Sequence, residues 1–86
     1  MTMKKIMFTA SNCPACTIVK PFAEEHDFDI IDLDTDNGLA LANLHNVRGL
    51  PTILLIDEWG NYLIRKTGTL SPKEKQEIKD IINNEN

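Results

Sequence analysis

Short apolar runs alternate along the chain with segments in which apolar residues recur at helical spacing. Four of the runs have the length and the polar boundaries that are typical of β-strands. They lie at Lys4–Thr9, Phe28–Leu33, Thr52–Ile56 and Tyr62–Lys66. Because Thr52–Ile56 is solidly apolar apart from its first residue, we expect it to be a central strand of a sheet.

The first helical pattern begins at Cys13, soon after the first predicted strand. Its apolar positions are Ile18, Val19, Phe22 and Ala23. Pro14 falls at the first helical position, where its missing N–H costs nothing and its fixed φ favours the helix. Pro21 lies inside the same helix, where it removes one hydrogen bond and should kink the helix.

Two further helices are predicted downstream. After a polar turn at Asp34–Gly38, apolar residues from Leu39 onward indicate a helix rich in small residues that ends near Asn46. The last helix starts with a capping box at Ser71–Glu74, with proline at its first helical position. Its apolar stripe comprises Ile78, Ile81 and Ile82. We expect residues 83–86 to fray.

The order of these elements, β-α-β-α-β-β-α, predicts a mixed sheet. A helix between the first two strands implies a right-handed crossover and a parallel pair. Residues 57–61, which include Gly60, have the length of a hairpin loop and therefore predict an antiparallel pair. No repeat, low-complexity tract or linker interrupts the pattern. We expect a single α/β domain over residues 1–86, with a four-stranded sheet flanked by helices.

Composition and charge narrow the class of protein. Of the 86 residues, 42% are hydrophobic and 26% charged, as in ordinary globular domains. The net charge is -4, and there is no lysine or arginine cluster to meet a phosphate backbone, so we expect no nucleic-acid partner. No stretch approaches the ~20 apolar residues of a membrane span, and the apolar run near the start is too short for a secretory signal. We expect a cytoplasmic monomer that does not bind a membrane.

Both cysteines of the chain, Cys13 and Cys16, lie in the segment SNCPACT. Such a pair can hold a metal, form a structural disulfide or act as a redox centre. A zinc site needs four ligands, and the only histidines, His26 and His45, are far from each other along the chain. A disulfide that closes so short a loop constrains the unfolded chain little, and cytoplasmic thiols are mostly kept reduced. The pattern favours the redox centre.

Cys13 stands at the start of the predicted helix, where backbone N–H groups lack partners and the helix dipole is positive. Both effects stabilise a thiolate, and the amides of Ala15 and Cys16 are the expected donors. Cys13 is therefore the predicted nucleophile, and Pro14 and Ala15 support it. Cys16, one turn deeper, is the predicted resolving thiol. The redox group is then the Cys13–Cys16 disulfide itself, and we expect no bound cofactor and no metal.

A second motif, VRGLPTILL at Val47–Leu55, places Pro51 directly before the expected central strand. A proline at this position is unusual unless its peptide bond is special. Together with a CXXC at a strand–helix turn, the motif resembles the thioredoxin superfamily, in which a cis-proline in this loop packs against the CXXC. Pro21, Gly60 and Gly68 also fall in the family's order. The resemblance covers nearly the whole chain and implies a minimal thioredoxin fold of glutaredoxin size.

The resemblance also implies how substrate binds. A cis bond at Pro51 would place the backbone of Leu50 beside Cys13, where its N–H and C=O could pair with an extended substrate segment. Asn12 stands where thioredoxins usually have a tryptophan. We therefore expect Asn12, Leu50 and Pro51 to contact substrate.

Other positions depart from the families that the chain resembles. Met7 stands where thioredoxins carry a buried aspartate, so Cys16 lacks that carboxylate for proton transfer. The Pro14-Ala15 dipeptide is closer to that of glutaredoxins, but Gly68 is a single glycine where glutathione-binding glutaredoxins usually have two. Lys20, one turn beyond Cys16, is either a solvated helix lysine or a source of positive potential at the site.

The resemblance implies a thiol–disulfide oxidoreductase that reduces protein disulfides and carries electrons. Its partners would be disulfide-containing proteins and a reductant that is thioredoxin reductase-like or glutathione-based. Two alternatives stay open. One is a glutathione-dependent glutaredoxin. The other is a binding module with dispensable cysteines that recruits a partner through Trp59 and the Leu50–Pro51 groove.

Overall fold

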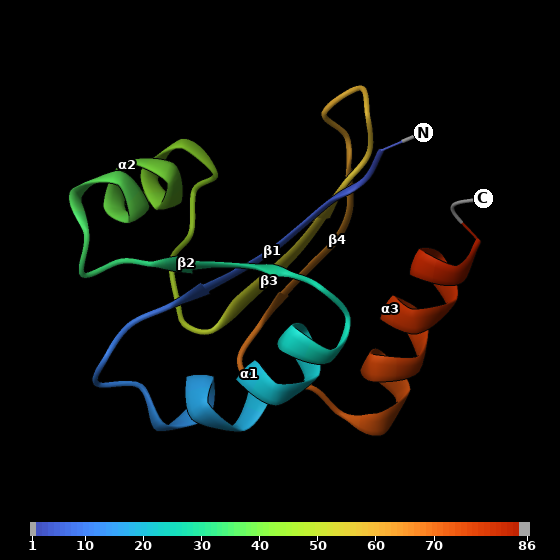
Figure 1. Ribbon diagram of the computed structural model, residues 1–86, viewed down its shortest axis with the longest axis horizontal. Coiled ribbons are helices and arrows are strands. Elements are labelled where there is room, and N and C mark those ends of the chain that lie inside the picture. Colours follow the sequence, from blue (N-terminus) through green and yellow to red (C-terminus); the bar gives the residue numbers. More distant parts are fainter. Residues whose placement is uncertain (1, 85–86) are drawn as a thin grey trace.

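A computed structural model describes residues 2–84 of the chain (Figure 1). It contains four strands and three helices in the predicted order. The elements are β1 (Lys4–Thr9), α1 (Pro14–Glu25), β2 (Asp29–Asp32), α2 (Asp36–Leu44), β3 (Thr52–Ile56), β4 (Tyr62–Thr67) and α3 (Pro72–Asn83). The predicted α/β class and element order are confirmed.

The four strands form one mixed sheet in the order β2-β1-β3-β4. β1 pairs in parallel with β2, as the helical crossover between them predicts. β3 pairs antiparallel with both β1 and β4. Every residue of β3 is buried, because β3 is an interior strand that is covered on both faces, which confirms the expectation of a central strand.

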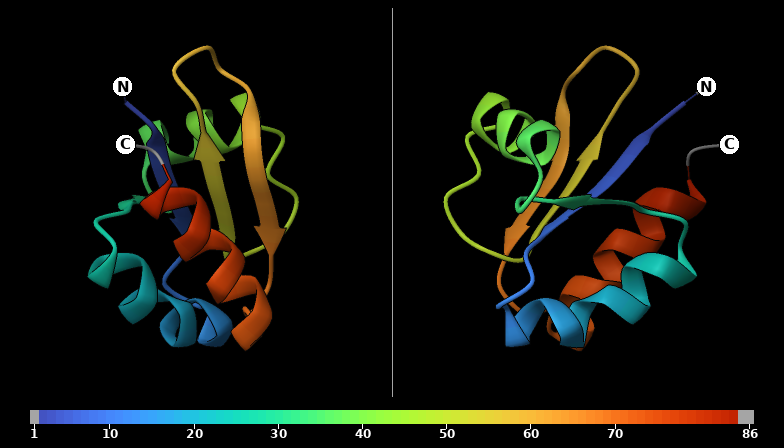
Figure 2. Two further views of the ribbon diagram at one scale, coloured as in Figure 1. Left: turned by 90° about the vertical axis from the view of Figure 1, so that its right-hand side faces the viewer. Right: turned by 60° about the vertical axis from the view of Figure 1, so that its left-hand side comes forward.

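Helices cover both faces of the sheet (Figure 2). On one face, Met7, Ile53 and Leu55 pack with residues of α1 and with Ile78 of α3. On the other face, Phe8, Leu54 and Ile56 pack with Ala42 of α2. Successive strand residues point to opposite faces, so β1 and β3 supply both apolar clusters. The side that carries α1 and α3 also carries the cysteines.

The prediction of a polar turn over Asp34–Gly38 is wrong in part, because α2 begins at Asp36. The Thr35 side chain caps this helix by accepting a hydrogen bond from the Gly38 amide at 2.9 Å. A Cβ on residue 38 would collide with the backbone carbonyl of Asp32, so glycine is needed where α2 meets the end of β2. The helix also ends at Leu44, two residues before Asn46.

β1 and β3 have the predicted bounds, whereas β2 and β4 differ from prediction by one residue at one or both ends. α1 starts at Pro14 with Cys13 as its N-cap, and it continues through Pro21 to Glu25. β2 is shorter than the predicted Phe28–Leu33, and β4 is one residue longer than predicted. The capping box of α3 is confirmed by two reciprocal hydrogen bonds between Ser71 and Glu74, at 2.9 and 3.1 Å. Of the end that was expected to fray, residues 85 and 86 lie outside the described residues, and α3 ends at Asn83 with Asn84 as its C-cap.

Candidate active site

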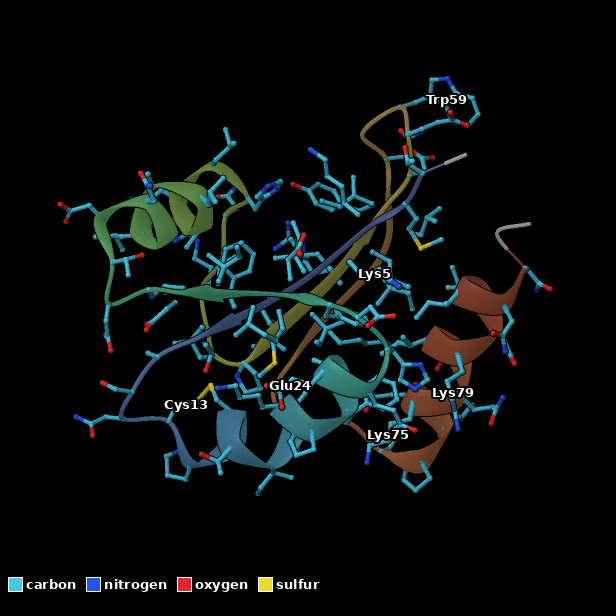
Figure 3. All side chains as sticks on the ribbon, in the orientation of Figure 1. Lys5, Cys13, Glu24, Trp59, Lys75 and Lys79 are labelled. Carbon is cyan, nitrogen blue, oxygen red and sulfur yellow. A yellow bond between two sulfur atoms is a disulfide. The ribbon has the colours of Figure 1, made fainter. Side chains whose placement is uncertain are left out.

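A disulfide joins Cys13 and Cys16 at the N-terminal end of α1, with their Cα atoms 5.2 Å apart (Figure 3). Cys13 has extended backbone geometry, at φ -135° and ψ 92°, as an N-cap residue requires. The next residue, Pro14, occupies the first helical position. The local sequence thus ends the loop after β1 and starts the helix at the first cysteine.

The sulfur of Cys13 acts as the helix cap. Cys13 Sγ accepts a hydrogen bond from the backbone amide of Cys16 at 3.1 Å. The Ala15 amide was the second expected donor. Within residues 2–84, it does not donate a hydrogen bond to Cys13 Sγ. One of the two predicted donors is therefore in place in the oxidised form. The same amide and the positive end of the helix would stabilise a thiolate on Cys13 once the disulfide is reduced.

The two sulfurs differ in exposure. Cys13 is half-buried and lines an open hollow of about 350 Å³, together with Ser11, Asn12, Pro14 and Thr17. Cys16 is only 2% exposed and belongs to the apolar cluster under α1. A substrate disulfide could therefore approach the sulfur of Cys13 from solvent, whereas the sulfur of Cys16 could attack only from behind it.

The loop before β3 comes to the same side of the sheet. The peptide bond between Leu50 and Pro51 is cis, and Pro51 is fully buried. Leu50 is half-buried and packs against the apolar cluster that Cys13 also contacts. Cys13 and Leu50, which are more than thirty residues apart in the sequence, thus border the same apolar cluster, and Asn12 lines the hollow beside Cys13.

Hydrogen bonds fix this loop to the end of β4. The buried hydroxyl of Thr52 donates to the Gly49 carbonyl at 2.6 Å and lies 3.2 Å from the Thr67 hydroxyl. The Gly68 amide donates to the Pro51 carbonyl at 2.8 Å. A Cβ on Gly49 would lie 2.9 Å from the Thr67 methyl group, so this approach is tight. Hydrogen bonds therefore fix the backbone at Gly49, before Pro51, and at Pro51 itself.

A carboxylate fixes the loop that precedes Cys13. Asp34 Oδ2 accepts a hydrogen bond from the Ser11 amide at 3.1 Å. Hydrogen bonding to Ser11 holds the pKa of Asp34 below its ordinary value of 3.8. The sequence predicts a polar turn that begins at Asp34, and it does not predict this contact. The parallel pairing of β1 and β2 could have indicated it, because Ser11 and Asp34 each follow the end of one of these strands.

Comparison with known proteins decides the family. The sequence profile of the family described as Thioredoxin matches residues 3–84. The chain belongs to the thioredoxin family. Membership and the paired cysteines together support a thiol–disulfide oxidoreductase in general. No curated protein matches the chain significantly.

Solved structures of thioredoxin-like proteins share the fold. A structure titled as that of a malarial protein aligns with a TM-score of 0.77 at 25% identity, over 94% of this chain and 97% of that one. A mutant thioredoxin from Halobacterium salinarum aligns with a TM-score of 0.72 at 28% identity, over 94% of this chain and 72% of that one. Thioredoxin from Trypanosoma brucei brucei aligns at 0.75 and 22% identity, over 95% and 76%, and shows the fold alone.

The remaining predicted residues of this thioredoxin-family chain occupy different places. Met7 is fully buried and packs in the same cluster as Cys16, so an apolar side chain fills the core beside the second sulfur. Trp59 is 74% exposed at the tip of the β3–β4 hairpin, at the opposite end of the molecule from Cys13 (Figure 3). His26 and His45 are the C-cap residues of α1 and α2 respectively.

Two negative findings apply to residues 2–84. No group of three or more His, Cys, Asp or Glu side chains is placed to hold a metal ion. None of the three helices there has the length and apolar character to cross a bilayer.

Proposed function

We propose that the chain is a protein-disulfide reductase in which Cys13 is the nucleophile and Cys16 the resolving thiol. One observation carries the proposal. The half-buried sulfur of Cys13 accepts the Cys16 amide at the N-terminus of α1, while the sulfur of Cys16 is buried behind it. This geometry stabilises negative charge on the sulfur that substrate can reach first.

The reaction takes two thiol–disulfide exchanges. The Cys13 thiolate attacks one sulfur of the substrate disulfide, a mixed disulfide forms, and the other substrate sulfur leaves as a thiolate. Cys16 then loses its proton and attacks Cys13 Sγ. The Cys13–Cys16 bond forms, the bond between Cys13 and substrate breaks, and the second substrate thiolate leaves. The substrate gains two electrons and the protein returns to the disulfide form.

The loop at Leu50–Pro51 is the proposed docking site for the substrate backbone. Within residues 2–84, neither the amide nor the carbonyl of Leu50 takes part in a hydrogen bond outside regular helices and strands. An extended substrate segment could pair with both groups as an added strand. Asn12, which is exposed beside Cys13, would contact the segment from the other side.

The electron donor is proposed to be a thioredoxin reductase-like enzyme of the cytoplasm. Glutathione with its own reductase is the competing donor. Turnover of the same disulfide substrate with each donor, at equal protein concentration, separates them. A higher rate with glutathione would replace the proposal with a glutaredoxin.

Reduction of insulin disulfides tests the activity itself. The parent protein should accelerate insulin precipitation by dithiothreitol, and Cys13→Ser should abolish this effect because no thiolate attacks. Cys16→Ser is the matched control, since it keeps the first attack and should accumulate a mixed disulfide that is visible by mass. A Cys13→Ser variant as active as the parent would refute the proposal.

A further inference from the structure

A second hollow gives solvent a route to the buried cysteine. Cys16 borders a hollow of about 410 Å³ that lies along α1 and adjoins the hollow beside Cys13, with which it shares Ser11 and Thr17. Lys20 and Glu24 line the same hollow. The three residues stand at successive four-residue intervals, so they form one row on a single helix face. The side of Cys16 that faces this hollow is therefore lined by charged side chains.

Elsewhere, the surroundings of Cys16 are apolar. Met7 of β1, Ile53 of β3 and Ile78 of α3 are fully buried in the cluster that contains Cys16. Of the residues that line the hollow, only Lys20 and Glu24 carry charge. Asp34, in the loop after β2, accepts a hydrogen bond from the amide of Ser11, which is one of the residues that line the hollow. Lys5 of β1 is half-buried on the same sheet face as Met7, but among the charged side chains it is Lys20 and Glu24 that line the hollow with Cys16.

Lys20 is available for this role. Within residues 2–84, a salt bridge joins Lys66 and Glu74, and neither Lys20 nor Glu24 is engaged in an ion pair. Lys20 is exposed and lies one helical turn from Cys16, with ~6 Å between the Cβ atoms of such neighbours. Glu24 lies a further turn away. Of these two charged residues, the positively charged Lys20 is therefore the nearer to Cys16.

We propose that Lys20 is a positioning residue for the second exchange, and that its ammonium group stabilises the Cys16 thiolate across this hollow. The inference rests on the proposed function. Before the attack, the thiol of Cys16 releases its proton to water in the hollow. The thiolate then forms the bond to Cys13 Sγ, and the electron pair of the broken bond leaves on the substrate sulfur. Lys20 changes no bond; it lowers the free energy of the charged sulfur.

The test separates the two exchanges with one equivalent of dithiobis(nitrobenzoate), an aromatic disulfide that releases a coloured thiolate at each step. In stopped flow, the reduced parent should release the first thiolate as Cys13 attacks the reagent and the second as Cys16 resolves the mixed disulfide. At low salt and neutral pH, Lys20→Gln should slow the second phase about threefold, and should move the midpoint of its pH profile upward. Lys20→Arg should restore both.

Two matched variants control for charge. Lys4→Gln removes one positive charge at the far end of β1 and should leave the second phase unchanged. Glu24→Gln removes the opposing charge from the hollow and should speed the second phase slightly. An unchanged second phase in Lys20→Gln, an equal loss in Lys4→Gln, or no rescue by arginine would overturn the inference. Absence of the first phase in the parent would instead refute the proposed function.

Discussion

At the cysteine end of the sheet, hydrogen bonds join loops that are far apart in sequence, whereas the loop of the β3–β4 hairpin at the other end, residues 57–61, is held by its own residues. Ser11 bonds to Asp34 across 23 positions, and Gly68 bonds to Pro51. In the hairpin, the Asp57 carboxylate accepts from the amides of Trp59 and Asn61 at 2.9 and 2.8 Å. The reactive end is therefore positioned by tertiary contacts, and the hairpin by local turn geometry.

This difference predicts how damage spreads. A change in the hairpin should alter the hairpin and little else. A change in one loop at the cysteine end should move its partner loop as well, and therefore the groups that surround Cys13.

Thr52→Val should cause the largest loss of stability. The buried hydroxyl bridges the Gly49 carbonyl and the Thr67 hydroxyl, and valine would leave the carbonyl without a partner. We expect a loss of about 2 kcal/mol in the free energy of unfolding, measured by chemical denaturation. Thr67→Val removes only the weaker, more exposed contact and should cost under about 1 kcal/mol. Equal losses in the two variants would contradict this assignment.

Two glycines allow a matched comparison of the ends. Gly60 in the hairpin and Gly68 after β4 have φ values of 87° and 96°, and at both positions an added Cβ meets nothing within 4 Å. Gly60→Ala and Gly68→Ala should therefore each lower the free energy of unfolding by about 1 kcal/mol, through backbone strain alone. Only Gly68 bonds to Pro51, so Gly68→Ala should also reduce insulin reduction, while Gly60→Ala should not. An equal loss of activity in both would break the comparison.

Asp34→Asn should give the smallest effect, and one that depends on pH. Hydrogen bonding to Ser11 lowers the pKa of Asp34 in the folded state. The Asp34 carboxylate therefore stabilises the fold fully above pH 3.8, and this stabilisation is lost as the pH falls through the pKa of Asp34 in the folded protein. Thermal melts from pH 6 down to about pH 2 should show a smaller acid loss in Asp34→Asn than in the parent. Asp57→Asn, in the hairpin, should leave the rate of the first exchange with dithiobis(nitrobenzoate) unchanged, whereas Asp34→Asn should slow it. Parallel acid profiles for Asp34→Asn and the parent would contradict the prediction.

What could be predicted from the sequence follows the same division. The capping box of α3, the hairpin and the helix start at Cys13 all depend on residues within a few positions of each other, and all were predicted. The contacts of Asp34 with Ser11 and of Gly68 with Pro51 depend on strand order and on loop packing. No local pattern indicates them.

The start of α2 shows why a local interpretation fails. Asp36, Asn37 and Gly38 are residues that favour turns, and for this reason the segment was predicted to be a turn. In the structure, the Thr35 cap and the close approach of Gly38 to Asp32 outweigh that preference. Glycine serves here as the only residue small enough for the contact between helix and strand.

The cap of α1 has a further consequence, because the atom that ends the helix is also the atom that reacts. The Cys16 amide donates to Cys13 Sγ in the disulfide form, and it would face a charged acceptor in the thiolate form, where such bonds are stronger. The exchange rate of this one amide hydrogen with deuterated solvent should therefore differ between the two forms. A single backbone position would then serve as an internal gauge of the protein's redox state.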